Sequence, residues 1–141
     1  QTYQFKVKKI QIIIGPLFEE SYIDELKIYE SEYIKFIKNS KSYPDLLASA
    51  DLVFCSGGTT LLEAMCLGLP IVNYPQSKYE YNHALKYANL GACVFKERIN
   101  NVIESYVLRE NLRKNSLSQI DGNGSLRIAN LIKSFIGEIN A

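Results

Sequence analysis

The fold is decided by one stretch of the sequence, Asp51-Leu52-Val53-Phe54-Cys55-Ser56-Gly57-Gly58-Thr59-Thr60. Its first five residues are almost wholly apolar, as is typical of a central strand in a parallel sheet. The strand breaks directly into a Ser-Gly-Gly-Thr-Thr turn, and an apolar helix is expected over about residues 59–67. A strand, a glycine turn and a helix in this order predict an α/β fold with the turn at the carboxyl end of the strand.

The same alternation of short β-branched runs and helical segments continues on both sides, as in parallel βαβ units. We expect strands at residues 10–14, 33–37, 51–55, 70–74 and, at an edge, 92–95. Helices are expected at about 21–31 with Ser21 as N-cap, and at 44–50, 59–67, 79–90, 98–117 and after 121–124. The sequence therefore predicts a doubly wound, Rossmann-like parallel sheet of about five strands, with ligands outside the carboxyl ends of the strands.

Composition limits the classes of protein to which this chain can belong. With 141 residues and 47% apolar content, the chain predicts a single domain over 1–141 with its own core. Its net charge of +1 comes without charge blocks, which argues against a nucleic-acid partner. No apolar run approaches the roughly 20 residues of a membrane span. Three cysteines without CxxC spacing are typical of reduced core residues in a cytoplasmic protein.

The Ser56–Thr60 turn is the first candidate binding site. Glycines at 57 and 58 permit close backbone approach, and a helix amino end offers N–H groups to phosphate. Thr59 or Thr60 is expected to cap the helix and to donate to a phosphoryl oxygen. A purely structural role stays open as an alternative, since a tight βα turn needs glycine and a cap whatever it binds. Neither a Walker lysine nor a GxGxxG motif is present to decide between the two.

Glu63 follows one helical turn later in an otherwise apolar helix. Its carboxylate oxygens are suited to accept from both hydroxyls of a ribose. The alternative interpretation is a first-turn acid that complements the helix dipole.

Extended through Leu61-Leu62-Glu63-Ala64 to Gly68-Leu69-Pro70, the stretch resembles the carboxy-terminal domain of glycosyltransferase family 28, the MurG-like second half of a GT-B fold. Within that group the sequence is most similar to nucleotide-sugar hydrolases of the SpsG/PseG type, in spore-coat polysaccharide and pseudaminic acid biosynthesis. Asp121-Gly122-Asn123-Gly124-Ser125-Leu126-Arg127-Ile128 resembles the DGxGxxRI signature that closes that type. The resemblance covers about residues 10–137.

The resemblance implies a site for a uridine nucleotide. Glu63 would hold the ribose hydroxyls, and main chain near residues 36–38 would face the base. The diphosphate would lie against the glycine turn. The candidate nucleotide-binding residues are thus Ser56, Gly57, Gly58, Thr59, Thr60, Glu63, Phe36, Ile37 and Lys38. The family presents side chains to the donor sugar from the segment that corresponds to 79–84, where the candidates are Glu80, Asn82 and His83.

His83 is the only histidine and the residue that could act as a general base. Its spacing from Tyr79 and Tyr87, beside Ala84, favours a structural or exposed role instead. In the hydrolase type the catalytic base belongs to the amino-terminal domain, so we expect no catalytic residue in this chain. The sequence also offers no metal-ligand cluster, and no cofactor is expected.

The resemblance implies the UDP-sugar-binding domain of a surface or spore-coat polysaccharide enzyme that hydrolyses a UDP-linked amino or deoxy sugar at the anomeric carbon. The start at Gln1 without methionine indicates a fragment that needs an amino-terminal domain or a partner chain and has no turnover alone. Two alternatives are the donor domain of a family 28 glycosyltransferase and a non-catalytic subunit of a split GT-B enzyme. A flavodoxin-like domain is disfavoured because Gly15-Pro16 end the first strand.

Overall fold

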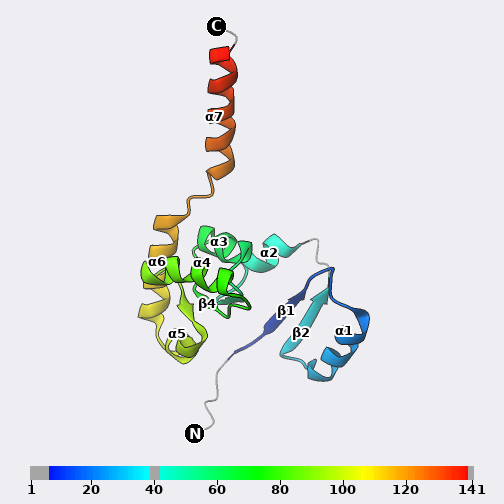
Figure 1. Cartoon of the computed structure of the whole chain (residues 1–141). Coiled ribbons are helices and arrows are strands. Elements are labelled where there is room, and N and C mark those ends of the chain that lie inside the picture. Colours follow the sequence, from blue (N-terminus) through cyan, green and yellow to red (C-terminus); the bar gives the residue numbers. More distant parts are fainter. Residues whose placement is uncertain (1–6, 39–41, 140–141) are drawn as a thin grey trace. The chain divides into compact units, whose positions relative to one another are not determined.

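A computed structural model describes residues 7–38 and 42–139 of the chain. The chain separates into two compact units, Gln1–Leu46 and Leu47–Ala141. Each unit is described by itself, and a single domain over 1–141 stays a prediction. Figure 1 shows the first unit in blue and cyan, with two strands beside one helix.

The first unit is one βαβ crossover. β1 (Ile10–Ile14) pairs in parallel with β2 (Ile34–Lys38), in a register that places Ile12 opposite Phe36. The connection contains α1 (Glu20–Leu26) and the 3₁₀ turn η1 (Lys27–Tyr29). Ile14 and Ile23 are buried, and the parallel pairing of β1 with β2 confirms the first predicted strand and the crossover.

The expected helix over 21–31 with Ser21 as N-cap is only partly right. The helix begins at Glu20, its N-cap is Glu19 without a side-chain hydrogen bond, and it ends at Leu26. Glu20 stands in the first turn, where a carboxylate complements the helix dipole without making a cap bond. The amino end of α1 is therefore stabilised by the charge of Glu20 and not by the expected hydroxyl cap.

The second unit contains a three-stranded parallel sheet in the order β3-β4-β5. Its strands are short, and helices connect them along the chain. In sequence order the elements are α2 (Tyr43–Ala48, which crosses the unit boundary), β3 (Val53–Cys55), α3 (Thr59–Cys66), β4 (Ile71–Asn73), α4 (Lys78–Asn89) and β5 (Val94–Phe95). The parallel α/β class and the edge position of β5 are as predicted.

The expected single sheet of about five strands needs correction. Within the described part of the chain there are five parallel strands, but they form sheets of two and three. The strands of the second unit are two or three residues long, so each ladder has few hydrogen bonds. The apolar runs predicted the number and direction of the strands but not their division between two sheets.

Helix α3 ends as its sequence predicts. Gly68, at φ +67°, follows the C-cap Leu67 and donates its N–H to the Met65 carbonyl. Leu69 N–H donates to the Ala64 carbonyl at 3.0 Å. These two bonds form a Schellman motif, in which glycine adopts the left-handed conformation without a Cβ penalty.

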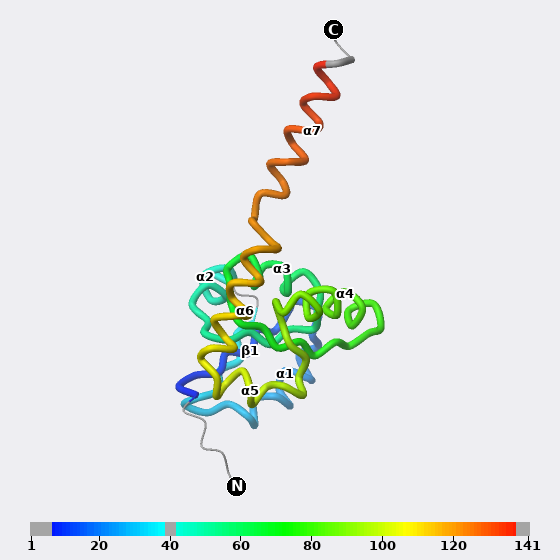
Figure 2. The backbone as a smooth tube through the Cα atoms, turned by 90° about the vertical axis from the view of Figure 1, so that its left-hand side faces the viewer, coloured from blue at the N-terminus to red at the C-terminus, as the bar shows by residue number. Residues whose placement is uncertain are grey.

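The core of the second unit contains a cluster of four buried residues, Val72, Val94, Val102 and Leu112. Two of them come from neighbouring strands, and the others come from α5 (Ile99–Glu104) and α6 (Tyr106–Gln119). The short turn η2 (Lys96–Arg98) joins β5 to α5, and Figure 2 follows the backbone through α5 and α6. Leu52, Ile99 and Leu108 pack around the cluster.

The helix expected over 98–117 is broken at Ser105, whose φ and ψ of −106° and 105° are extended. The Ser105 hydroxyl accepts from Leu108 N–H at 3.1 Å and caps α6. Arg109 Nη1 donates to the carbonyls of Val102 and Ile103, both at 2.7 Å. These bonds satisfy backbone groups at the end of one helix and the start of the next, which makes two helices favourable.

The last helix, α7 (Gly124–Ile139), follows the predicted Asp-Gly-Asn-Gly turn. Arg127 Nη1 donates to Asp121 Oδ2 at 2.6 Å, and this bond lowers the pKa of the Asp121 carboxyl to about 2. Six large apolar residues of this helix each keep more than half of their surface exposed, namely Leu126, Ile128, Leu131, Ile132, Phe135 and Ile136. None of the helices in the described residues is long and apolar enough to cross a bilayer.

Candidate functional site

The candidate site is built on the junction between β3 and α3. β3 ends at Cys55, Ser56 and Gly57 form the turn, and Gly58 is the N-cap of α3. Since Gly58 is the N-cap and Thr59 is already the first helical residue, the predicted cap by Thr59 or Thr60 is wrong. The turn lies at the carboxyl end of a parallel strand, where α/β folds bind ligands.

Gly57 is required by the geometry of this turn. Its φ is +107°, and a Cβ built on it would lie 2.8 Å from the Glu80 carbonyl oxygen and 3.3 Å from Ala84 Cβ. A side chain would therefore strain the backbone and collide with α4 at the same time. At Gly58 the nearest atom, Glu80 Oε1, would be 3.9 Å away, so only the first glycine is packed tightly.

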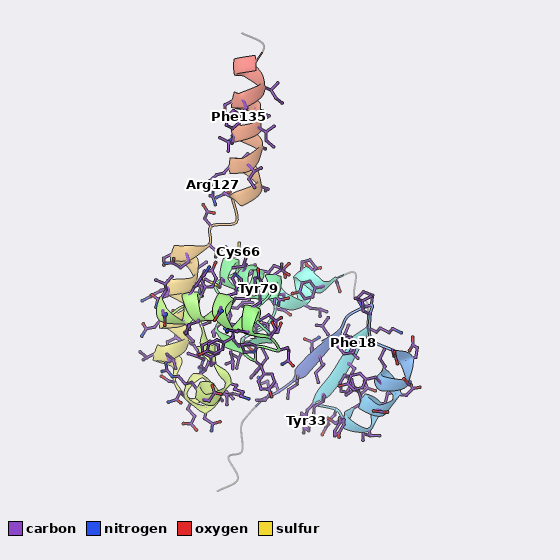
Figure 3. The ribbon with its side chains drawn as sticks, in the orientation of Figure 1. Phe18, Tyr33, Cys66, Tyr79, Arg127 and Phe135 are labelled. Carbon is purple, nitrogen blue, oxygen red and sulfur yellow. The ribbon has the colours of Figure 1, made fainter. Side chains whose placement is uncertain are left out.

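His83 holds the turn from α4. Its Nδ1 lies 2.6 Å from the Gly57 carbonyl oxygen, and since a carbonyl accepts, Nδ1 is the donor. The half-buried ring stacks on Tyr79, labelled in Figure 3, and meets Tyr87 edge-on. The structure thus places His83 against the backbone of the turn, and whether its role is structural or catalytic stays a prediction.

Glu80 connects the Ser56–Gly58 turn to the residues at the start of α4. Its Oε2 accepts from Gln76 N–H at 2.8 Å, and its own N–H donates to the N-cap hydroxyl of Ser77. A hydrogen bond from the Ser56 side chain, followed by these contacts, lowers the pKa of the Glu80 carboxyl. Glu80 and His83 both contact the Ser56–Gly58 turn, and their role toward a sugar stays a prediction.

The other candidate residues lie on separate elements. Glu63 is exposed on α3, one turn after Thr59, and Asn82 is exposed on α4. Phe36, Ile37 and Lys38 form the end of β2 in the first unit, where the Lys38 ammonium pairs with Glu20. Within residues 7–38 and 42–139, no three His, Cys, Asp or Glu side chains gather as a metal ion would require. The nucleotide contacts of these residues stay predictions.

A cleft of about 600 Å³ opens at the carboxyl ends of β4 and β5, and the sequence did not predict it. Asn73, Tyr74, Tyr81, Phe95 and Lys96 line it, together with Pro75, Gln76, Ser77, Lys78 and Glu97. The available signal was the polar residue at the end of the buried run 70–73, which stands where parallel strands present ligand-binding groups.

Asn73 is fully buried beneath this cleft. Its Oδ1 accepts from the Cys55 thiol at 3.5 Å, while its Nδ2 has no hydrogen-bond partner among the described residues. Burial raises the pKa of Cys55 to about 11 and that of Cys93 to about 12. Both thiols are therefore protonated at neutral pH, as expected for core cysteines.

The chain has a GT-B glycosyltransferase-like α/β fold, as comparison with solved structures shows. It superimposes with a TM-score of 0.69 on a protein from Listeria monocytogenes assigned as a UDP-N-acetylglucosamine 2-epimerase, at 14% identity over 95% of this chain and 47% of the other. The TM-score with the glycotransferase of kitacinnamycin is 0.60, at 16% identity over 91% of this chain and 43% of the other.

Two curated proteins are similar in sequence. The spore coat polysaccharide biosynthesis protein SpsG of Bacillus subtilis strain 168 is 23% identical over 145 residues, 94% of this chain and 43% of SpsG. The uncharacterized protein MJ1062 of Methanocaldococcus jannaschii is 31% identical over 107 residues, 70% of this chain and 20% of that protein. The chain thus spans less than half the length of these relatives. No family model matches the sequence.

Proposed function

We propose that this chain is the nucleotide-sugar-binding part of a cytoplasmic enzyme of surface or spore-coat polysaccharide biosynthesis. The enzyme hydrolyses a UDP-linked amino or deoxy sugar at its anomeric carbon. The similarity to SpsG supports the biosynthetic role, and the fold shared with a UDP-N-acetylglucosamine 2-epimerase and a glycotransferase supports a nucleotide-sugar ligand. Transfer of the same sugar to an acceptor, as in a family 28 glycosyltransferase, would require the same contacts with the donor nucleotide-sugar.

The observation that carries the proposal is the geometry of the Ser56–Gly58 turn. The turn follows β3, precedes α3, and is held by the Gly57–His83 hydrogen bond and the Glu80 carboxylate. A fixed turn at a helix amino end favours the negative charge of a diphosphate. Held there, the leaving nucleotide would gain stabilisation as the glycosidic bond breaks.

Glu63→Ala is expected to weaken UDP binding roughly tenfold or more, because the ribose hydroxyls would lose a charged acceptor. The measurement is an amide-resolved NMR titration of the full chain with UDP. Shifts are expected at residues 57–60.

Glu104→Ala removes an exposed acid from the end of α5 and serves as the matched control, with wild-type affinity expected. Absence of shifts up to millimolar UDP would overturn the nucleotide proposal. Equal losses of UDP affinity in the two variants would show that Glu63 does not bind the ribose.

A second candidate function rests on exposed apolar residues of the first strand. Ile10, Ile12 and Ile13 of β1 keep 43%, 38% and 39% of their surfaces exposed, and exposed apolar groups of this kind favour a partner surface. This observation supports a non-catalytic subunit that completes a split GT-B enzyme. Such a subunit would bind UDP weakly alone and more tightly once a partner chain is added.

A further inference from the structure

We infer that the cleft at the ends of β4 and β5 binds the sugar of the nucleotide-sugar and selects a sugar that carries a carboxylate. This inference rests on the proposed function, and it assigns the cleft to the glycosyl group. The cleft opens on the carboxyl-end side of the sheet, as does the Ser56–Gly58 turn on the adjacent strand. Its volume of about 600 Å³ is in the range of small-molecule sites and is ample for a sugar ring.

Aromatic side chains form the apolar part of the cleft. Tyr81 and Phe95 stack with ring centroids 5.0 Å apart and planes 23° from parallel, and together they form one apolar side of the cleft. Tyr74, half exposed, stands at the cleft as well. Flat aromatic surfaces of this kind suit the C–H face of a pyranose ring, which packs apolar area while its hydroxyls face outward.

Lys96 supplies the charge that would select a carboxylate. Its Nζ lies 4.3 Å from the centroid of the Tyr74 ring, a cation–π contact that positions the ammonium and leaves it free to donate. None of the ion pairs in the described residues involves Lys96. Lys78 and Glu97 also line the cleft, and the Glu80 carboxylate accepts from the lining residue Gln76, so the selection would come from the position of Lys96 and not from the net charge.

The test compares UDP-glucuronate with UDP-glucose, which differ in a carboxylate, by calorimetric titration of the full chain. UDP-glucuronate is expected to bind roughly five- to tenfold more tightly, as for one charge-assisted contact at a partly exposed site. Lys96→Met should reduce the ratio to within about twofold, and Lys96→Arg should restore most of it. Lys114→Met removes an exposed charge from α6 and should leave the ratio unchanged.

The outcomes separate the two proposals. If UDP binds and the two sugars bind equally, or if Lys96→Met keeps the preference, the carboxylate inference is overturned while the nucleotide proposal stands. If neither UDP nor either UDP-sugar binds, both are overturned. A preference that Lys114→Met removes as well would point to net charge and would overturn the assignment to Lys96.

Discussion

Gly57→Ala is expected to lower the free energy of unfolding by about 2–4 kcal/mol, because a methyl group adds backbone strain and a collision at one position. The residue has φ +107°, and its Cβ would lie 2.8 Å from the Glu80 carbonyl oxygen. That oxygen belongs to the backbone of α4, so relief requires movement of the helix or the turn. Since the chain contains no tryptophan, urea unfolding is best followed by circular dichroism.

Gly58→Ala is the matched control for this prediction. It places the same methyl group one residue later, where φ is −81° and the nearest atom would be 3.9 Å away. The expected loss is no more than about 1 kcal/mol, mainly from alanine at an N-cap position. Equal losses in the two variants would show that the contact with α4 does not determine the conformation of the turn.

Leu112→Ala is expected to destabilise the second unit by about 2–5 kcal/mol. Leu112 is 2% exposed and is the contribution of α6 to the cluster with Val72, Val94 and Val102. Truncation removes apolar contacts from both strands and from α5 and leaves a cavity in a packed core. Urea unfolding of wild type and variant measures the difference.

Leu117→Ala provides the comparison within the same helix. Leu117 keeps 45% of its surface exposed. Its truncation should therefore lower the free energy of unfolding by about 1 kcal/mol or less. A small effect at Leu112 alongside an unchanged Leu117 variant would mean that α6 is not packed on β4 and β5 as described.

Much of the fold could be predicted because its determinants are local. The run that becomes β3 is apolar and short, and Gly68 marks the end of α3, so pattern alone located both. The break at Ser105 was missed because the charged segment keeps helical spacing on both sides. The break in the helix is favoured by the Arg109 side chain, which donates to the Val102 and Ile103 carbonyls. The spacing of apolar residues in the sequence does not reveal such a contact.

The candidate site was predictable to a smaller extent. The Ser56–Thr60 turn is contiguous in sequence and was therefore visible as one motif. The cleft combines residues 73–81 with 95–97, which come together only because β4 and β5 are neighbours in the sheet. Lys96 and Phe95 carry no motif of their own, so their proximity to Tyr74 and Tyr81 required the strand order.

Two thiols with raised pKa values, Cys55 and Cys93, give this chain a useful property for labelling. With pKa values of about 11 and 12, Cys55 and Cys93 at pH 8 are thiolates in only about one molecule in 10³ and one in 10⁴, and the thiolate is the reactive form. Cys66 stands at the end of α3 and is partly buried like Cys55, and its sulfur would lie 3.0 Å from a Cβ built on Gly122. Because Cys55 and Cys93 react slowly, a maleimide dye would attach mainly at Cys66 and would report on the turn that precedes α7.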